Sequence, residues 1–206
     1  MKDKFYGDKR DLVKWGGIVY LCQENSIKTV FQVTYYHQSK WEKIDFNRGK
    51  SVPLPEDVSR HFRCIKDIRR LGRRANLDIQ VFNREFKNNK KDREEYHKEI
   101  CKEIERPNKL YKKKIVFLDP DKGLKPKKTC TYEHVRPNEV KLIWKSLKPK
   151  DFLVFYQHKP WFSKKGWKED CRHEFATRCG LKDVRMWSAD GIAKDVVFYF
   201  VEKKKR

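Results

Sequence analysis

Residues 113–124 read Lys-Lys-Ile-Val-Phe-Leu-Asp-Pro-Asp-Lys-Gly-Leu, and this stretch decides the fold of the chain. Its four consecutive apolar residues, Ile115 to Leu118, are typical of a strand that is buried on both faces of a sheet. Pro120 has no backbone N–H to donate, and Gly123 permits a tight turn. We therefore predict that the strand ends at Asp119.

Two carboxylates, Asp119 and Asp121, follow this predicted strand. Ligands of open α/β sheets bind outside the carboxyl ends of the strands, so both side chains are candidates for a functional site. Carboxylates at such positions are also typical of sites with perturbed pKa values. A solvated Asp-Pro turn without a functional role remains the alternative interpretation at this stage.

The composition favours one folded domain with a polyanionic partner. The 206 residues include 51 Lys and Arg against 29 Asp and Glu, which gives a formal net charge of +22. Such a charge favours nucleic acid as the partner, although a thermophilic or AT-rich genomic background also produces lysine-rich surfaces. The 13 Phe, 9 Tyr and 6 Trp supply material for a core. We expect a single domain over residues 1–206, with a long loop at 37–55 and a frayed basic tail at 203–206.

The cysteines and the apolar runs exclude several classes of protein. The six cysteines form no Cys-x-x-Cys pair, so their spacing supports neither a zinc site nor a secreted disulfide framework. The first residues contain no apolar signal segment, and no apolar run is long enough to cross a bilayer. We therefore expect a soluble, cytoplasmic protein.

Strands and helices alternate along the chain. Helices are predicted over residues 8–22, 56–72, 92–105, 138–147 and 164–179, and strands over 28–36, 78–82, 115–118, 152–156, 183–187 and 195–201. The first helix is expected to bury Leu12, Trp15, Val19 and Cys22 on one side. A short turn joins the last two strands, which predicts that they pair antiparallel. The expected fold is α/β, a Rossmann-like mixed sheet with helices on both faces and a C-terminal antiparallel β-hairpin.

The second predicted helix is strongly basic. Seven basic residues and one acid lie between Arg60 and Arg74. A solvated basic face is one interpretation, and contact with phosphate groups is at least as well supported. The candidates for phosphate contact are Arg63, Lys66, Arg69, Arg70, Arg73 and Arg74.

Residues 7–15, Gly-Asp-Lys-Arg-Asp-Leu-Val-Lys-Trp, carry a resemblance to a known family. They are similar to the Gly-Asn-x-Ala-Asp-Val-Leu-Lys-His segment of the RlmJ-type adenine-N6 methyltransferases, Rossmann-like class I enzymes that act on large-subunit ribosomal RNA. In that family the segment helps to hold S-adenosylmethionine. The resemblance therefore implies a cofactor-binding role for Gly7, Asp8, Asp11 and Lys14.

The Asp-Pro-Asp motif extends this resemblance. It stands where the family carries Asp-Pro-Pro-Tyr, which implies that Asp119 accepts a hydrogen bond from the target amino group. Asp121 and Lys122 replace the second proline and the tyrosine, so a base would have to stack on an aromatic side chain from another loop, with Trp161, Phe162 and Tyr132 as candidates. Residues 35–38, Tyr-Tyr-His-Gln, stand in place of the family's acidic, glycine-rich loop.

Nearly the whole chain resembles a family of uncharacterised bacterial proteins even more closely. The shared patterns are Gly-Asp-x-x-Asp-x-x-Lys, Phe-Leu-Asp-Pro-Asp-x-Gly-Leu and Val-x-Tyr-Gln-His, and they occur here at residues 7–14, 117–124 and 154–158.

The residues themselves leave two other functions open. Asp119, Asp121 and His158 could bind Mg²⁺ and catalyse phosphodiester hydrolysis, because carboxylate oxygens are the ligands that Mg²⁺ prefers. His158 is equally interpreted as a hydrogen-bonded loop histidine. The third possibility is a non-catalytic nucleic-acid-binding protein. Trp161, Trp167 and Trp187 are interpreted as packing residues, with base stacking as the alternative.

Overall fold

The chain folds around a mixed six-stranded sheet. The computed structural model describes residues 7–37, 43–46, 50–53, 67–106, 113–127, 130–161 and 163–205. The strand order is β4-β1-β5-β8-β10-β9. The strands are β1 (Thr29–Val33), β4 (Asp78–Phe82), β5 (Lys114–Leu118), β8 (Phe152–His158), β9 (Arg185–Ala189) and β10 (Lys194–Glu202). The first four strands of this order run parallel, and β10 runs antiparallel to β8 and β9. The predicted α/β fold with a C-terminal hairpin is confirmed.

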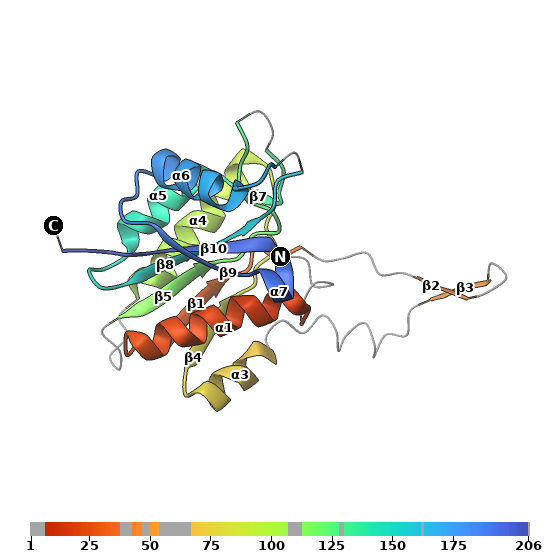
Figure 1. Cartoon of the computed structure of the whole chain (residues 1–206), viewed down its shortest axis with the longest axis horizontal. Helices are drawn as coiled ribbons and strands as arrows, with labels where there is room; N and C mark the ends of the chain where they lie inside the picture. The colour runs from red at the N-terminus through yellow and green to blue at the C-terminus, as the bar shows by residue number, and fades with distance from the viewer. Residues whose placement is uncertain are drawn as a thin grey trace.

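Helices cover both faces of the sheet (Figure 1). One layer contains α4 (Lys90–Glu105), α5 (Pro137–Ser146) and α6 (Trp167–Cys179), and the other contains α1 (Lys9–Glu24), α3 (Ile68–Ala75) and α7 (Asp190–Ala193). Because side chains of a strand alternate between faces, Val116 and Leu118 join the core under the first layer, whereas Ile115 and Phe117 join the second core. All four side chains are fully buried, as predicted.

Helix α1 has a buried side that differs from the predicted one. Asp8 caps the helix by accepting hydrogen bonds from the N–H groups of Arg10 and Asp11. The predicted Leu12 is 67% exposed, and Val19 is only partly buried. The buried stripe instead includes Asp11, Lys14, Trp15 and Ile18, at the i, i+3, i+4, i+7 spacing of one helix face. The apolar pattern was misleading because two charged residues belong to the buried stripe.

Gly17 allows β9 to approach α1 closely. A Cβ atom added to Gly17 would overlap the indole ring of Trp187, whereas one added to Gly16 would meet open space. The indole Nε1–H donates to the carbonyl of Val13 at 3.3 Å, and the ring stacks on Phe198. Trp187 is therefore a packing residue, as interpreted from the sequence.

Three other predicted segments differ from the structure. The predicted loop 37–55 contains the antiparallel strands β2 (Lys43–Phe46) and β3 (Lys50–Pro53), whose short alternating apolar pattern is too weak to stand out among polar residues. The described part of the predicted helix 56–72 is α3, which continues to Ala75. The short turn predicted before β10 contains α7 instead.

The prediction that the basic tail 203–206 is frayed is wrong for Lys203 and Lys204, which are anchored. The Lys203 N–H donates to the carbonyl of Asp151 at 2.8 Å, and its ammonium donates to the carbonyl of Trp144 at 2.6 Å. Lys204 forms an ion pair with Asp183.

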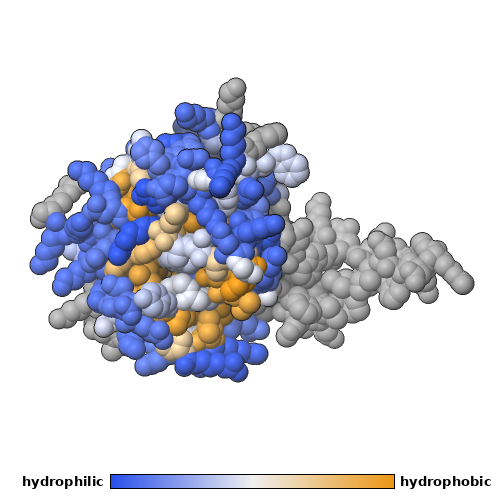
Figure 2. All heavy atoms as spheres, viewed as in Figure 1, coloured by the Kyte–Doolittle hydropathy of each residue, from blue (hydrophilic) through white to orange (hydrophobic). Residues whose placement is uncertain are grey.

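Figure 2 shows that hydrophilic side chains cover most of one face of the molecule, while apolar side chains gather near its centre. No helix in the described ranges is long and apolar enough to cross a membrane.

Candidate functional site

A cavity of about 190 Å³ lies beside the carboxyl ends of β5 and β8 and the N-terminal end of α1. Six of the residues singled out from the sequence line it: Asp8, Asp11, Lys14, Asp119, Asp121 and His158. They come from three segments of the chain, residues 8–14, 119–121 and 158, the first of which is more than a hundred residues from the other two. The other lining residues are Arg10, Pro120, Lys122, Glu133 and Tyr156.

The floor of the cavity is a buried charge cluster. The Lys14 ammonium donates to Asp11 Oδ1 at 2.5 Å and to Asp119 Oδ2 at 2.9 Å. The side chains of Lys14 and Asp119 are only 4% and 2% exposed. The Asp119 N–H donates to the carbonyl of Val33, which fixes the end of β5 beside β1. Because the partners come from a helix and a strand end, this cluster is set by the fold and not by a flexible loop.

The cluster perturbs the pKa values of its members. Burial lowers the pKa of Lys14, but the charges of Asp11 and Asp119 raise it by more, so the side chain stays an ammonium. Burial raises the pKa of Asp119, and the Lys14 ammonium opposes that rise. Asp119 is thus a carboxylate whose affinity for a proton is raised, next to a fixed positive charge.

Gln32 is a member of this cluster that sequence reasoning missed. It lies in the middle of β1, is 1% exposed, and donates from Nε2 to Asp119 Oδ2 at 2.9 Å. Within the described part of the chain, the hydrogen bonds to the Asp119 carboxylate both go to Oδ2. The signal in the sequence was a single amide inside an otherwise apolar strand.

A second ionic group lies at the rim of the cavity. The Arg10 guanidinium donates to Asp8 Oδ2 at 2.8 Å and to Asp195 Oδ2 at 2.5 Å. His158 Nε2 lies 3.4 Å from the same Asp195 oxygen, and its Nδ1 lies 3.0 Å from the carbonyl of Lys159. His158 is therefore held by Asp195 and its own turn. Asp195 and Arg10 were not identified from the sequence, because their partners come from opposite ends of the chain.

The neighbour of His158 has a structural role. Gln157 Oε1 accepts the Leu124 N–H at 3.0 Å, and its Nε2 donates to the carbonyl of Lys122 at 2.9 Å. Gly123 has a φ of +106°, and a Cβ atom there would overlap the Gln157 amide. Gln157 thus fastens the segment after Asp119 to the end of β8, where β6 (Gly123–Leu124) pairs with β7 (His134–Val135).

The charge of the cavity is opposite to that of the protein. Among the described residues, its lining contributes five carboxylates and three permanent cations, whereas the whole chain carries +22. Two of the cations, Arg10 and Lys14, are bound to carboxylates of the same lining. Lys122 pairs with Glu133 at 2.6 Å. The cavity therefore suits a ligand with a positive charge or several N–H donors.

Gly7 lies next to the cavity and closes the turn that enters α1. Its φ is +80°, which only glycine adopts without strain, and its N–H donates to Asp11 Oδ2 at 2.6 Å. Asp11 thus binds Gly7 and Lys14 at the same time. The four residues of the Gly-Asp-x-x-Asp-x-x-Lys pattern form one connected hydrogen-bonded unit at the start of this helix.

The segment after β1 lies in the opposite core. Tyr35 is 1% exposed, has a φ of +45°, and packs against Phe86, Tyr96 and His97. Among the described residues, none from 34–37 lines the cavity. The Tyr35 ring therefore does not fill the cavity beside Asp119. This segment also offers no glycine at which a ligand could approach the backbone closely.

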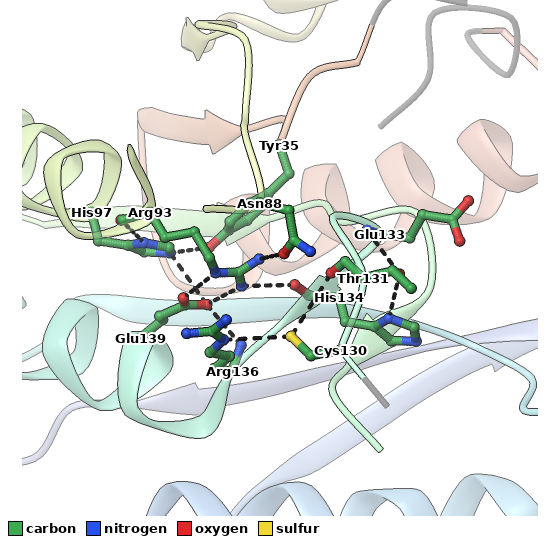
Figure 3. Close-up of polar contacts among 10 residues, drawn as sticks. All are labelled: Tyr35, Asn88, Arg93, His97, Cys130, Thr131, Glu133, His134, Arg136 and Glu139. Carbon is green, nitrogen blue, oxygen red and sulfur yellow. Dashed lines mark hydrogen bonds and ion pairs between the residues drawn. The ribbon is translucent and has the colours of Figure 1, made fainter. Parts of the chain in front are cut away.

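A buried ion pair fixes the loops around Tyr35 (Figure 3). Arg93, which is 1% exposed, donates two hydrogen bonds of 2.7 Å to Glu139 and a third to the carbonyl of His134. The His97 ring lies 2.7 Å from the carbonyl of Arg93 and 3.4 Å from the Tyr35 hydroxyl. Every one of these groups lies outside the cavity lining, so the network is interpreted as structural.

The geometry at Asp119 also bears on the magnesium hypothesis. A metal ion at the Asp119 carboxylate would meet the Lys14 ammonium, which already contacts Oδ2. In the described part of the chain no group of three His, Cys, Asp or Glu side chains is arranged to hold a metal ion. Asp119, Asp121 and His158 line one cavity, but His158 is directed to Asp195.

The predicted basic surface is only partly described. Arg69, Arg70, Arg73 and Arg74 are exposed on α3. Arg63 and Lys66 lie outside the described residues. Helix α3 covers the sheet beside β4, at the opposite edge from β9 (Figure 1).

Comparisons with known proteins give one distant structural neighbour. No family model and no curated protein matches the chain. Among solved structures, the chain is similar to one described as "putative rRNA-methylase" from Clostridium thermocellum, with 11% sequence identity and a TM-score of 0.36. The match covers 89% of this chain and 96% of that one. Similarity at this level carries no argument about activity.

Proposed function

We propose that the protein is a methyltransferase that uses S-adenosylmethionine and acts on an exocyclic amino group of nucleic acid, with adenine N6 as the target. The observation that carries the proposal is an acidic cavity, with the buried carboxylate of Asp119 at its floor, in a chain of net charge +22. The basic surface suits a polyanionic substrate, and the acidic cavity suits the N–H donors of a base and the cationic end of the cofactor.

The residues present fit part of the cofactor. The carboxylates of Asp8, Asp121 and Glu133 line the cavity, Asp8 with Arg10 and Glu133 with Lys122 as partners, and they would hold the sulfonium and ammonium groups of the cofactor. The segment after β1 provides no glycine cradle, so we assign the cationic end of the cofactor to the cavity and leave its nucleoside unassigned. When bound, the cofactor supplies the methyl group.

The chain's own residues then have separate tasks. Asp119 accepts a hydrogen bond from the target amino group through Oδ1, which orients the nitrogen lone pair. Lys14 and Gln32 hold Asp119 through Oδ2 and keep it from rotating. Methyl transfer would form the N–C bond and break the bond between the methyl group and the cofactor's sulfur, which leaves as a thioether, and Asp119 would be suited to take the proton that the amino nitrogen loses because burial raises its pKa. Tyr156 also lines the cavity.

Isothermal titration calorimetry with S-adenosylmethionine tests this function. The wild-type protein is expected to bind the cofactor, and to transfer a labelled methyl group to RNA or DNA. Asp119→Asn is expected to reduce transfer about 100-fold or more, because a positioned proton acceptor contributes roughly that factor. Asp78→Asn, which removes an exposed carboxylate from β4, serves as the matched control.

Two results would overturn the proposal. One is the absence of cofactor binding by the wild-type protein, and the other is equal methyl transfer by Asp119→Asn and Asp78→Asn. Cleavage of the nucleic acid that requires Mg²⁺, is abolished by a chelator, and is lost in Asp119→Asn would support the nuclease hypothesis instead. Salt-dependent binding without cofactor or turnover would support the non-catalytic hypothesis.

A further inference from the structure

A second hollow lies next to the cavity, on the other side of Gln157. Its volume is about 610 Å³, and its lining is contributed by residues 124–127, by Gln157 and Pro160, and by one side of α6. Gln157 borders this groove, whereas its neighbour His158 borders the cavity. The two hollows therefore lie at the same end of the sheet, the cavity on the α1 side and the groove on the α6 side, with the Gln157 amide and the backbone that it fastens between them.

One side of the groove is basic and is lined by Lys125, Pro126 and Lys127. Pro160 also lines it and belongs to the loop that follows β8, whose lysines and Trp161 lie beside the groove in the chain. Residues 159–168 of that loop read Lys-Pro-Trp-Phe-Ser-Lys-Lys-Gly-Trp-Lys and contain four lysines and no acid. Lys127, Lys159, Lys164 and Lys165 are all exposed. This combination of positive charge and aromatic rings is typical of surfaces that bind single-stranded nucleic acid.

The two tryptophans of this loop have different environments. Trp167 is 7% exposed and belongs to the core, whereas Trp161 is 91% exposed. The packing interpretation of Trp161 from the sequence was therefore wrong. The turn that carries it is held by hydrogen bonds from the N–H and Oγ of Ser163 to the carbonyl of Pro160, at 3.1 and 2.7 Å. Trp161 is thus an exposed ring on a hydrogen-bonded support.

The floor of the groove suits bases better than phosphates. Asp170 and Glu174 line it, and Glu174 is paired with Arg178, which also donates to the carbonyl of Lys125 at 2.6 Å. Carboxylates repel phosphate groups but accept hydrogen bonds from the amino groups of bases. The expected arrangement places the backbone along the lysine rims and the bases toward α6.

We propose that this groove binds single-stranded nucleic acid, that Trp161 stacks on one base, and that a neighbouring nucleotide enters the cavity beside Asp119. The proposal rests on the proposed nucleic-acid substrate and adds its strandedness and its route. It also moves the main contact surface from α3 to the groove. A duplex is excluded from this role, because its stacked bases cannot lie on an isolated ring.

Fluorescence anisotropy with a labelled single-stranded RNA of about 12 nucleotides tests the proposal, because strands of this length fill one such site. The same sequence as single-stranded DNA and as a duplex distinguishes the classes of nucleic acid. Trp161→Ala is expected to weaken single-strand binding by about 5- to 150-fold, the range measured for loss of a stacked base. Tyr20→Ala, which removes an exposed aromatic ring from α1, is the matched control and is expected to bind as wild type.

Charge reversal on the rims provides an independent measurement. The double variant Lys127→Glu/Lys165→Glu is expected to weaken binding and to reduce its salt dependence, because phosphate contacts are lost. Lys91→Glu/Lys98→Glu makes the same change in net charge on the exposed side of α4 and should have a smaller effect. The variants Arg69→Glu/Arg73→Glu compare the groove with α3 directly.

The results separate this proposal from the proposed function. If the protein binds the cofactor but Trp161→Ala and the rim variants have no effect on nucleic-acid binding, the groove proposal is wrong and the methyltransferase proposal is unaffected. Single-strand binding that depends on Trp161 and the rims, without any cofactor binding, would support the groove and overturn the methyltransferase. A stronger loss from the α3 variants than from the rim variants, or tighter binding of the duplex than of the single strand, would overturn the groove.

Discussion

Replacing Lys14 with methionine keeps a side chain of similar length and removes the ammonium that lies between Asp11 and Asp119. Both contacts are short, at 2.5 and 2.9 Å, and the Lys14 side chain is 4% exposed, so solvent cannot replace the lost charge. Removing one partner of a buried ion pair costs about 3–5 kcal/mol of unfolding free energy. Because a domain has a total stability of about 5–15 kcal/mol, the variant is expected to fold but to be close to its limit.

The loss of unfolding free energy caused by Lys14→Met should depend on pH in a defined direction. In the variant the pKa of Asp119 rises further, because burial still raises it and Lys14 no longer opposes the rise. A carboxyl group whose folded pKa lies above its unfolded value stabilises the fold at low pH, and this stabilisation is lost as the pH rises through the folded pKa. The difference between wild type and Lys14→Met is therefore largest near neutral pH and shrinks as the pH falls.

Urea unfolding followed by circular dichroism measures both effects at about pH 7 and about pH 5. Lys14→Met/Asp119→Asn should recover part of the loss at the higher pH, because it leaves one uncompensated carboxylate instead of two. Lys98→Met, on the exposed side of α4, should stay within about 0.5 kcal/mol of wild type. If Lys14→Met loses less than about 1 kcal/mol of unfolding free energy at the higher pH, or loses the same amount at both pH values, the interpretation of Lys14 as part of a buried ionic cluster is wrong.

Three further predictions concern other parts of the fold. Gly17→Ala is expected to lower the stability measured by thermal unfolding by about 1–3 kcal/mol, because the new methyl group overlaps the facing indole. Gly16→Ala places its methyl group in open space and should be neutral or stabilising by up to about 1 kcal/mol. Equal effects of the two substitutions would contradict the close approach of β9 to α1. Arg93→Met is expected to cost about 3–5 kcal/mol in urea unfolding, and Arg93→Met/Glu139→Leu should recover much of it; no recovery would argue against a buried pair. Burial lowers the pKa of His97, so the stability of the fold should fall as the pH drops below about 6.5, where the unfolded histidine binds a proton. His97→Gln should show a weaker dependence of stability on pH. If the slope of stability against pH is unchanged in this variant, His97 is excluded as its source.

Much of the sheet could be predicted, because its signal is local. The apolar run before Asp119 gave β5, and the same kind of run gave β8 and β10. The spacing of Asp8, Asp11 and Lys14 also placed these side chains near one another on the first helix, and the structure brings them to Asp119. These predictions succeeded because the side-chain period of a strand or a helix can be recognised within a short stretch of sequence.

The rest of the site depends on contacts between distant segments. Arg10 reaches Asp195 across the sheet, and Gln32 reaches Asp119 from the neighbouring strand. A single sequence contains no pattern that pairs such residues. The same limit explains Trp161 and Trp167, which stand six residues apart and differ only in the surface that the fold brings to them. The buried face of α1 was misjudged because its stripe includes charges that only a partner on β5 can compensate.

The position of β10 has a consequence for how the protein is made. This strand follows β9 in the chain but lies between β8 and β9 in the sheet. A nascent chain on the ribosome therefore has an open edge on β8 until residues 194–202 emerge, and β9 has no place in the sheet before then. An open, apolar edge is a site for aggregation, so premature termination or slow translation near this point should leave a chain that depends on chaperones.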